Sequence, residues 1–198
     1  MEAARQEEAQ DVVVVVVPLP AQSHLAQLHH FSLLLCGRPG LSVPCPTPAH
    51  VRRFRAPGRP AVRSLSASSR RVVVVHDPLA SFAAVEAAAL HNAESYTFQC
   101  LPALFQLVFD RPSAADELSD RGLALPPLDG IVTEKFGAFA KRHMGENTAS
   151  AGTLLNTCRP FEDEFIDLLA REPKLRDRKI FTIGPLTELD AFVAHITR

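Results

Sequence analysis

Two unbroken runs of valine dominate the pattern of hydrophobic and polar positions along the chain. Val12–Val17 and Val72–Val75 contain no other residue type. A continuous β-branched run, in place of strict alternation, is typical of a strand that is buried on both faces of a parallel sheet. We therefore predict a strand at each run.

Helical spacing of apolar residues follows the first valine run. After the turn at 18–23, we expect a helix from about His24 to Cys36, with Gly37 placed to end it. Its expected inward positions are Leu25, Leu28, Phe31 and Leu35.

The second valine run leads through His76, Asp77 and Pro78 into an alanine-rich helix. Proline suits the first helical turn, and an aspartate just before it is a favourable cap. Three apolar residues form one stripe of this helix: Phe82, Val85 and Ala89.

Shorter patterns extend the alternation of strands and helices. We expect further strands at 41–43, 96–100, 153–156 and 180–183, and a helix around 104–109. A helix after 156 has acidic residues in its first turn, where the helix dipole favours them, and its expected inward residues are Phe161, Phe165, Leu168 and Leu169. Together these elements predict an α/β fold with a mostly parallel sheet and flanking helices.

Two stretches lie outside this pattern. Residues 52–71 carry seven arginines among Pro, Ser and Gly, and we interpret 52–70 as a basic, solvated loop. A nucleic-acid site is the alternative, but only Phe54 is available there for base stacking. Residues 110–130 are rich in Pro and Gly and indicate a long or poorly ordered loop.

Composition and charge narrow the classes of function. The chain has 198 residues, 46% hydrophobic and 22% charged, with a net charge of −1. These values are ordinary for a globular domain and favour neither nucleic acid nor a membrane as partner. The acidic segment 1–10 is unlike a signal peptide, and we expect it to be a disordered tail of a cytoplasmic protein. The four cysteines, Cys36, Cys45, Cys100 and Cys158, form no C-x-x-C pair, which predicts free thiols.

His24 and Asp77 are the candidate catalytic residues. Each follows the carboxyl end of a valine-rich strand, and ligands of open parallel sheets bind at that edge. An imidazole titrates near neutral pH, and an adjacent carboxylate would orient it and stabilise its protonated form. Both residues also have ordinary alternatives, as a surface residue at a helix start and as a helix cap.

Other chemistry is less well supported by the sequence. His29 and His30 share no ligand face with His24, so we predict no metal site. His76 would point to the opposite side of the strand from Asp77, which favours a packing role. The chain has no G-x-G-x-x-G, no P-loop and no G-x-S-x-G motif, which counts against dehydrogenases, NTPases and α/β-hydrolases.

Four motifs in order resemble the N-terminal domain of plant family-1 UDP-glycosyltransferases, most of all the cis-zeatin O-glucosyltransferase branch. The first is Val12–Leu25, continued by Gln27–Leu28 and Phe31–Leu35, and the second is Arg71–Ala80, continued to Cys100. The closing motifs are Leu155–Phe165 and Phe181–Leu186.

The resemblance implies the N-terminal half of a GT-B fold, with a Rossmann-like sheet that binds the acceptor. It places the catalytic base at His24 and its supporting acid at Asp77, with Ser23 and Gln22 facing the donor. It also implies a UDP-sugar co-substrate, UDP-glucose, together with a small hydroxylated acceptor such as a zeatin-type cytokinin. No cofactor and no metal are expected, and the protein is expected to be a monomer.

The resemblance also sets the expected domain boundaries. Residues 11–187 would be the acceptor domain and 188–198 the start of the interdomain linker, and the donor domain would be absent. The chain has no tryptophan, whereas the family's donor box is rich in it. The interval between His24 and Asp77 is shorter than the family's, and His76 replaces a usual apolar residue. We expect the isolated chain to be inactive, and two alternatives stay open: a non-catalytic remnant or small-molecule binding module, and a stand-alone nucleotide-binding protein.

Overall fold

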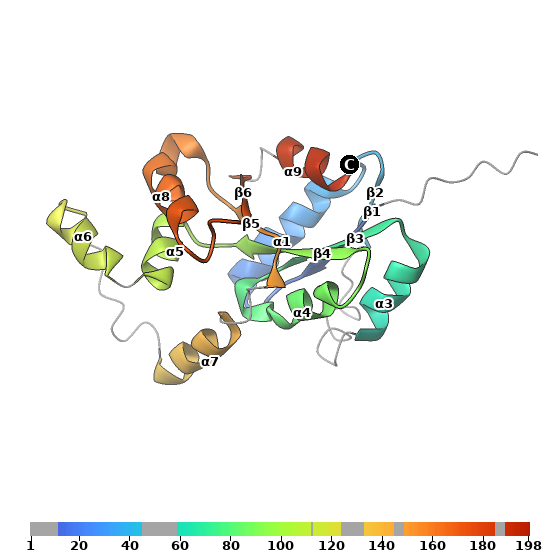
Figure 1. Ribbon diagram of the computed structural model, residues 1–198, viewed down its shortest axis with the longest axis horizontal. Helices are drawn as coiled ribbons and strands as arrows, with labels where there is room; N and C mark the ends of the chain where they lie inside the picture. Colours follow the sequence, from blue (N-terminus) through green and yellow to red (C-terminus); the bar gives the residue numbers. More distant parts are fainter. Residues whose placement is uncertain (1–11, 45–58, 112, 124–132, 145–148, 185–188) are drawn as a thin grey trace, which may run out of the picture.

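A six-stranded parallel sheet forms the centre of the protein (Figure 1). The computed structural model describes residues 12–44, 59–111, 113–123, 133–144, 149–184 and 189–198. The strand order is β2-β1-β3-β4-β5-β6, and every neighbouring pair is parallel. The strands are β1 (Val12–Val17), β2 (Leu41–Ser42), β3 (Arg71–His76), β4 (Ala93–Gln99), β5 (Gly152–Leu155) and β6 (Lys179–Thr182). The predicted α/β fold with a parallel sheet is confirmed.

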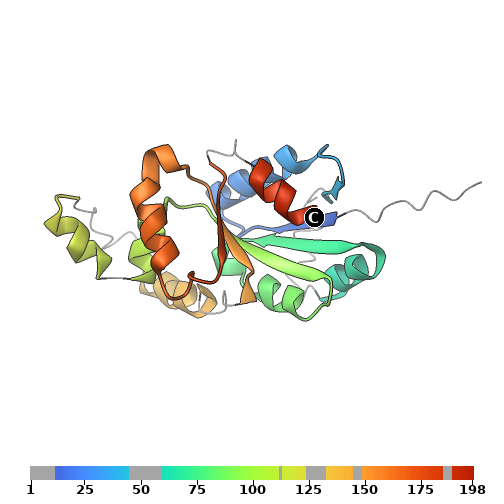
Figure 2. The ribbon, with the colours of Figure 1, turned by 45° about the horizontal axis from the view of Figure 1, so that its top comes forward.

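Helices cover both faces of this sheet (Figures 1 and 2). α1 (Gln22–Leu35) and α9 (Asp190–Ile196) pack on one face, and α3 (Arg59–Ser68) and α4 (Phe82–Ala88) pack on the other. The remaining helices are α5 (Ala103–Asp110), α6 (Ala114–Asp120), α7 (Glu134–Met144), α8 (Arg159–Arg171) and the 3-10 turn η1 (Pro78–Ala80). Within the described ranges, no helix is both long and apolar enough to cross a bilayer.

The valine runs supply the core of both layers. In β1, the even-numbered valines face α1 and α9, and the odd-numbered valines face α3 and α4. All six are buried. Full burial of one such side chain contributes about 1.5–3 kcal/mol. The buried valines of β1 and β3 therefore hold the helices to both faces of the sheet.

The arginine-rich segment differs from the loop predicted for 52–70. Residues 59–68 form helix α3, whose Val62 is buried and Leu65 half-buried while Arg63 is exposed. Composition suggested a loop, but apolar residues at i and i+3 give this stretch one face that packs on the sheet. Residues 52–58 lie outside the described residues.

Two further predictions are wrong. Helix α6 lies within the loop predicted at 110–130, with Leu118 buried; residues 124–130 are outside the described ranges. The predicted inward stripe of Phe82, Val85 and Ala89 is exposed, because the helix packs on the sheet through the small side chains of Ala83, Ala84 and Ala87.

Phe161 in α8 is 80% exposed, although it was expected to face inward. The reason is a backbone departure at the next residue, Glu162, whose φ of −136° is not helical. Its carboxylate accepts hydrogen bonds from the backbone N–H groups of Ala103 and Leu104, at 2.9 and 3.1 Å. Glu162 thereby caps α5 and takes the inward position.

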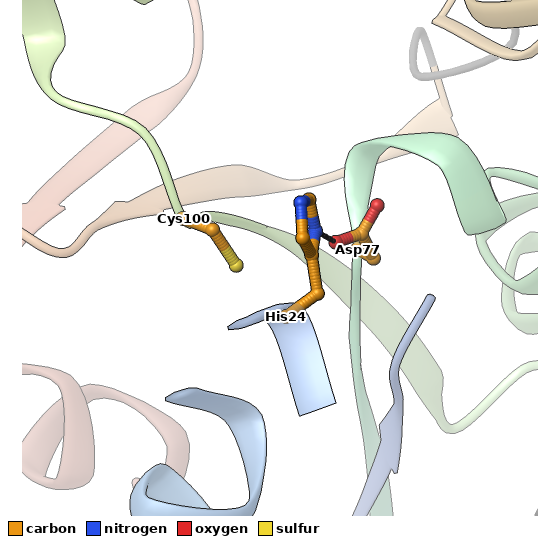
Figure 3. Close-up of side chains that lie close together, drawn as sticks. All are labelled: His24, Asp77 and Cys100. Atoms are coloured by element: carbon orange, nitrogen blue, oxygen red, sulfur yellow. Dashed lines mark hydrogen bonds and ion pairs between the residues drawn. The ribbon is translucent and has the colours of Figure 1, made fainter. Parts of the chain in front are cut away.

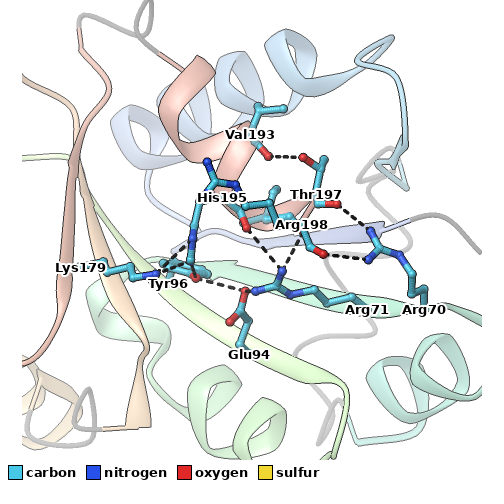
Figure 4. Close-up of polar contacts among 10 residues, drawn as sticks. Arg70, Arg71, Glu94, Tyr96, Lys179, Val193, His195, Thr197 and Arg198 are labelled. Carbon is cyan, nitrogen blue, oxygen red and sulfur yellow. Dashed lines mark hydrogen bonds and ion pairs between the residues drawn. The ribbon is translucent and has the colours of Figure 1, made fainter.

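The segment 188–198, expected to begin an interdomain linker, contains helix α9. Phe192 and Ile196 are fully buried in the core cluster on the α1 side. The guanidinium groups of Arg70 and Arg71 donate to carbonyls at the C-terminal end of α9, including that of Ile196 at 3.0 Å (Figure 4). This stretch therefore packs as part of the domain. The expected tail at 1–10 and the boundary at 185–188 lie outside the described residues.

Candidate active site

His24 lies in the first turn of α1, beyond the carboxyl end of β1. The helix begins at Gln22, two residues before the expected start. Its side chain is 23% exposed, and Nδ1 of its ring faces Asp77 at the end of β3.

Asp77 is the first residue after β3 and is fully buried. Side chains alternate along a strand, so Asp77 faces the same side as Val73 and Val75, toward α1. Its Oδ2 pairs with Nδ1 of His24 (Figure 3). Its Oδ1 accepts a hydrogen bond of 2.9 Å from the N–H of Leu79, so the carboxylate also caps η1. The structure thus brings the two predicted residues together.

The pairing fixes how His24 can act. A carboxylate accepts hydrogen bonds, so Nδ1 of His24 carries the proton and Nε2 keeps its lone pair. The hydrogen bond to Asp77 raises the pKa of His24 above its ordinary value; partial burial opposes this rise, and the negative charge of Asp77 adds to it. The arrangement can accept a proton at Nε2 and stabilise the resulting imidazolium.

His76 points to the opposite face from Asp77, as predicted, and is fully buried. Its Nδ1 donates to the carbonyl of Asp77 at 2.9 Å, and its Nε2 accepts from Oγ of Ser150 at 3.0 Å. Oγ of Ser150 in turn accepts from the hydroxyl of Thr97 at 3.0 Å. This chain of hydrogen bonds holds the backbone at Asp77, a role that the sequence did not reveal.

Cys100 is a third member of the cluster that sequence reasoning missed. It follows the carboxyl end of β4 and lies beside the His24 ring (Figure 3). Burial, and then the charge of Asp77, raises the pKa of its thiol to about 12. The signal in the sequence was the alternation of β4: Tyr96 and Phe98 face α1, and the next residue in that series is Cys100.

Gln27 ties α1 to the same edge of the sheet, one turn after His24. Its side-chain amide donates to the carbonyl of Cys100 at 3.4 Å, and its Oε1 accepts from the amide of Asn156 at 2.7 Å. Helix α1 is thereby attached to the ends of β4 and β5, which restricts the position of the His24 ring.

The other predicted site residues lie in or near α1. Gln22 and Ser23 are exposed in the first turn of α1, in the two positions before His24. His29 and His30 are exposed and belong to no cluster of metal ligands among the described residues. A pocket elsewhere, at the amino edge of β3 and β4, is a poor candidate because Arg70 and Arg71, which line it, are already bonded to α9.

The raised pKa of His24 predicts how its ion pair contributes to stability. A group whose folded pKa lies above its unfolded value of about 6.5 stabilises the fold fully below that pH and loses this contribution as the pH rises through the folded pKa. We expect Asp77→Asn, which can still cap η1, to remove the effect. In NMR titrations the His24 pKa should fall in this variant, and in denaturation curves the stability gap to wild type should narrow toward alkaline pH. An unchanged His24 pKa would contradict the pairing.

His76 predicts the opposite dependence. Burial lowers its pKa, so the unfolded chain binds more protons and stability is lost as the pH falls below about 6.5 toward the folded pKa. The loss can reach about 1.4 kcal/mol per pH unit. Denaturant unfolding of wild type and His76→Gln between pH 7.5 and 5.5, roughly the range of histidine titration, should show the steeper decline in wild type. Parallel curves would show that His76 does not remain neutral.

Known proteins resemble this chain over nearly its whole length. It matches the family described as glycosyltransferase, N-terminal domain, over residues 10–59 and 45–188. It is 32% identical to cis-zeatin O-glucosyltransferase 1 of Zea mays over 91% of its own length and 50% of the relative's. The zeatin O-glucosyltransferase of Phaseolus lunatus is 25% identical over 90% and 49% of the two chains. The chain therefore spans about half the length of the relatives it matches.

Solved structures share the fold. A glycosyltransferase from Siraitia grosvenorii in complex with UDP superposes with a TM-score of 0.63 and 23% identity, covering 91% of this chain and 49% of that one. UGT2 of Phytolacca americana, complexed with UDP-2-fluoro-glucose and pterostilbene, gives 0.62 and 16%, covering 90% and 55%. The expected fold, the N-terminal half of a GT-B architecture, is confirmed.

Proposed function

This chain belongs to the family of glycosyltransferase N-terminal domains, and from that premise we propose that it is the acceptor-binding half of a UDP-sugar-dependent O-glycosyltransferase. The observation that carries the proposal is the His24–Asp77 pair at the carboxyl edge of the sheet. A partly exposed imidazole held by a fully buried carboxylate is suited to deprotonating a hydroxyl that approaches from solvent.

In the proposed reaction, Nε2 of His24 accepts the proton of the acceptor hydroxyl. The acceptor oxygen forms a bond to the anomeric carbon of the sugar, the bond from that carbon to UDP breaks, and the configuration inverts. Asp77 keeps the ring in the Nδ1–H tautomer and stabilises the imidazolium until the proton leaves. Gln22 and Ser23, exposed beside His24, would face the donor.

The relatives suggest the substrates. Two are named cis-zeatin O-glucosyltransferases, so we propose a zeatin-type cytokinin or a similar small hydroxylated molecule as acceptor and UDP-glucose as donor. The proton transfer through His24 requires neither a cofactor nor a metal. We further propose a cytoplasmic monomer without a nucleic-acid or membrane partner.

The half-length match favours a second reading of these 198 residues taken alone, as a small-molecule binding module. We expect the purified chain to show no turnover of UDP-glucose with cis-zeatin, because the relatives' donor-side half has no counterpart in it. A chimaera that joins this chain to the C-terminal half of the maize cis-zeatin O-glucosyltransferase 1 should gain turnover, measured as glucoside formed. Robust turnover by the 198 residues alone would show that the separate donor-side half is not needed. A folded chimaera without any activity would count against the proposed function.

A further inference from the structure

Three metal-ligating side chains converge at the carboxyl edge of the sheet from three separate segments. A ring nitrogen of His24, a carboxylate oxygen of Asp77 and the sulfur of Cys100 all lie within 4.8 Å of one another. In Figure 3 the Cys100 side chain is directed toward the His24 ring, with Asp77 on the ring's other side. Among the described residues, this is the one group of three such ligands.

We propose that His24, Asp77 and Cys100 bind a thiophilic divalent cation, specifically Zn²⁺. Zinc is held by sulfur, nitrogen and carboxylate oxygen at about 2.0–2.3 Å, and three protein ligands leave a fourth tetrahedral position for water. Two ligand atoms of such an ion lie about 3.3–3.7 Å apart, a spacing that follows from those bond lengths. Binding an ion therefore requires small side-chain movements from the metal-free arrangement, in which His24 and Asp77 are hydrogen-bonded directly to each other.

The charge of the site suits a divalent cation. Asp77 is fully buried, and its ion pair among the described residues is with His24 alone. A thiolate, a carboxylate and a neutral imidazole together carry a charge of −2, which balances Zn²⁺. A bound cation deprotonates a ligating thiol, so the high pKa of Cys100 describes the metal-free site only.

Binding moves two protons. The thiol proton of Cys100 passes to solvent as the sulfur–metal bond forms. The cation also replaces the proton between Nδ1 of His24 and Oδ2 of Asp77; that proton moves to Nε2 when the ring is neutral, or to solvent when the ring is an imidazolium. With the ring bound in this way, Nε2 has no lone pair for an acceptor hydroxyl. Zinc would therefore inhibit base catalysis, a consequence that rests on the proposed function, whereas the binding itself does not.

Titration of the purified chain with Co²⁺, a coloured substitute for Zn²⁺, tests the site without any need for transferase activity. We expect a sulfur-to-cobalt charge-transfer band that saturates at one ion per chain and is lost when Zn²⁺ is added. Cys100→Ser should abolish the band. Loss of an outer-shell partner typically weakens metal binding by about 10- to 100-fold. Asp77→Asn and His24→Ala each remove a direct ligand, so they should weaken cobalt binding by at least that much.

Matched cysteine variants provide the controls. Cys36→Ser, at an exposed position, and Cys158→Ser, at a buried position outside the cluster, should keep the band. Should Cys100→Ser fail to fold by circular dichroism, NMR of the wild-type chain replaces it, and Zn²⁺ should shift the ring resonances of His24 but not those of the exposed His29. Absence of the band in wild type, its survival in folded Cys100→Ser, or His24 resonances unmoved by Zn²⁺ would each overturn the proposal. A chimaera with turnover but no cobalt band would refute the metal site alone. A chimaera that gives the band but shows no turnover when metal-free would refute only the glycosyl-transfer function.

Discussion

Replacing His24 by alanine is expected to lower the turnover of the chimaera by about 100- to 10,000-fold, the usual contribution of a general base. The reason is the geometry of the pair: Nε2 is the ring atom with a free lone pair, and a buried carboxylate holds Nδ1. Alanine removes both the proton acceptor and the hydrogen bond to Asp77, so circular dichroism of the variant must first show that it folds. Steady-state rates at saturating UDP-glucose and acceptor would measure the effect.

The pH profile separates catalysis from simple loss of structure. A general base is active when deprotonated, so kcat/KM should rise as the pH passes the raised pKa of His24. Asp77→Asn should shift this rise to lower pH while reducing the maximal rate. His29→Ala, an exposed position on the same helix, is the matched control and should leave both unchanged. If the turnover of His24→Ala stays within a few fold of wild type, roughly what a surface substitution without a specific role would cause, His24 is not the base.

The central sheet and the paired residues could be predicted from sequence because short-range rules determine them. An unbroken run of valines in a globular domain favours a strand that is buried on both faces of a parallel sheet. Successive side chains of a strand point to opposite faces, so the orientation of one residue predicts that of the next. Val73 and Val75 place Asp77 on the α1 side, and the same rule places His76 on the other. The convergence of His24 and Asp77 then requires only that β1 and β3 be neighbours, and they are paired along all six residues of each.

The remaining features depend on contacts between distant segments, which leave little trace in the local pattern. Helix α3 was predicted as a loop because the segment is rich in Arg, Pro and Ser, although Val62 and Leu65 have helical spacing. Phe161 was displaced from the interior by a carboxylate that caps a different helix. Cys100 joins the site from a third strand, and a ligand set drawn from separate strands has no spacing motif to find.

Phe192→Ala is expected to destabilise the domain by about 3–5 kcal/mol, a large part of the roughly 5–15 kcal/mol that holds a typical domain folded. Phe192 is fully buried, and its ring lies against those of Tyr96 and Phe181, with centroids 5.2 and 5.5 Å apart. Alanine would leave a cavity between α9 and the sheet that neighbouring rings cannot fill without moving. Denaturant midpoints of the purified chain would give the change in the free energy of unfolding.

The matched control for this substitution is Phe161→Ala, which removes the same side chain from a position that is 80% exposed. Its expected effect is within about 0.5 kcal/mol, so the difference between the two variants isolates the packing of α9. The comparison decides between two views of residues 189–198. A large difference means that α9, with the carbonyls at its C-terminal end held by Arg70 and Arg71, is part of the domain's core (Figure 4). Equal and small effects would mean that α9 detaches in solution, and that the segment behaves as the interdomain linker predicted from the sequence.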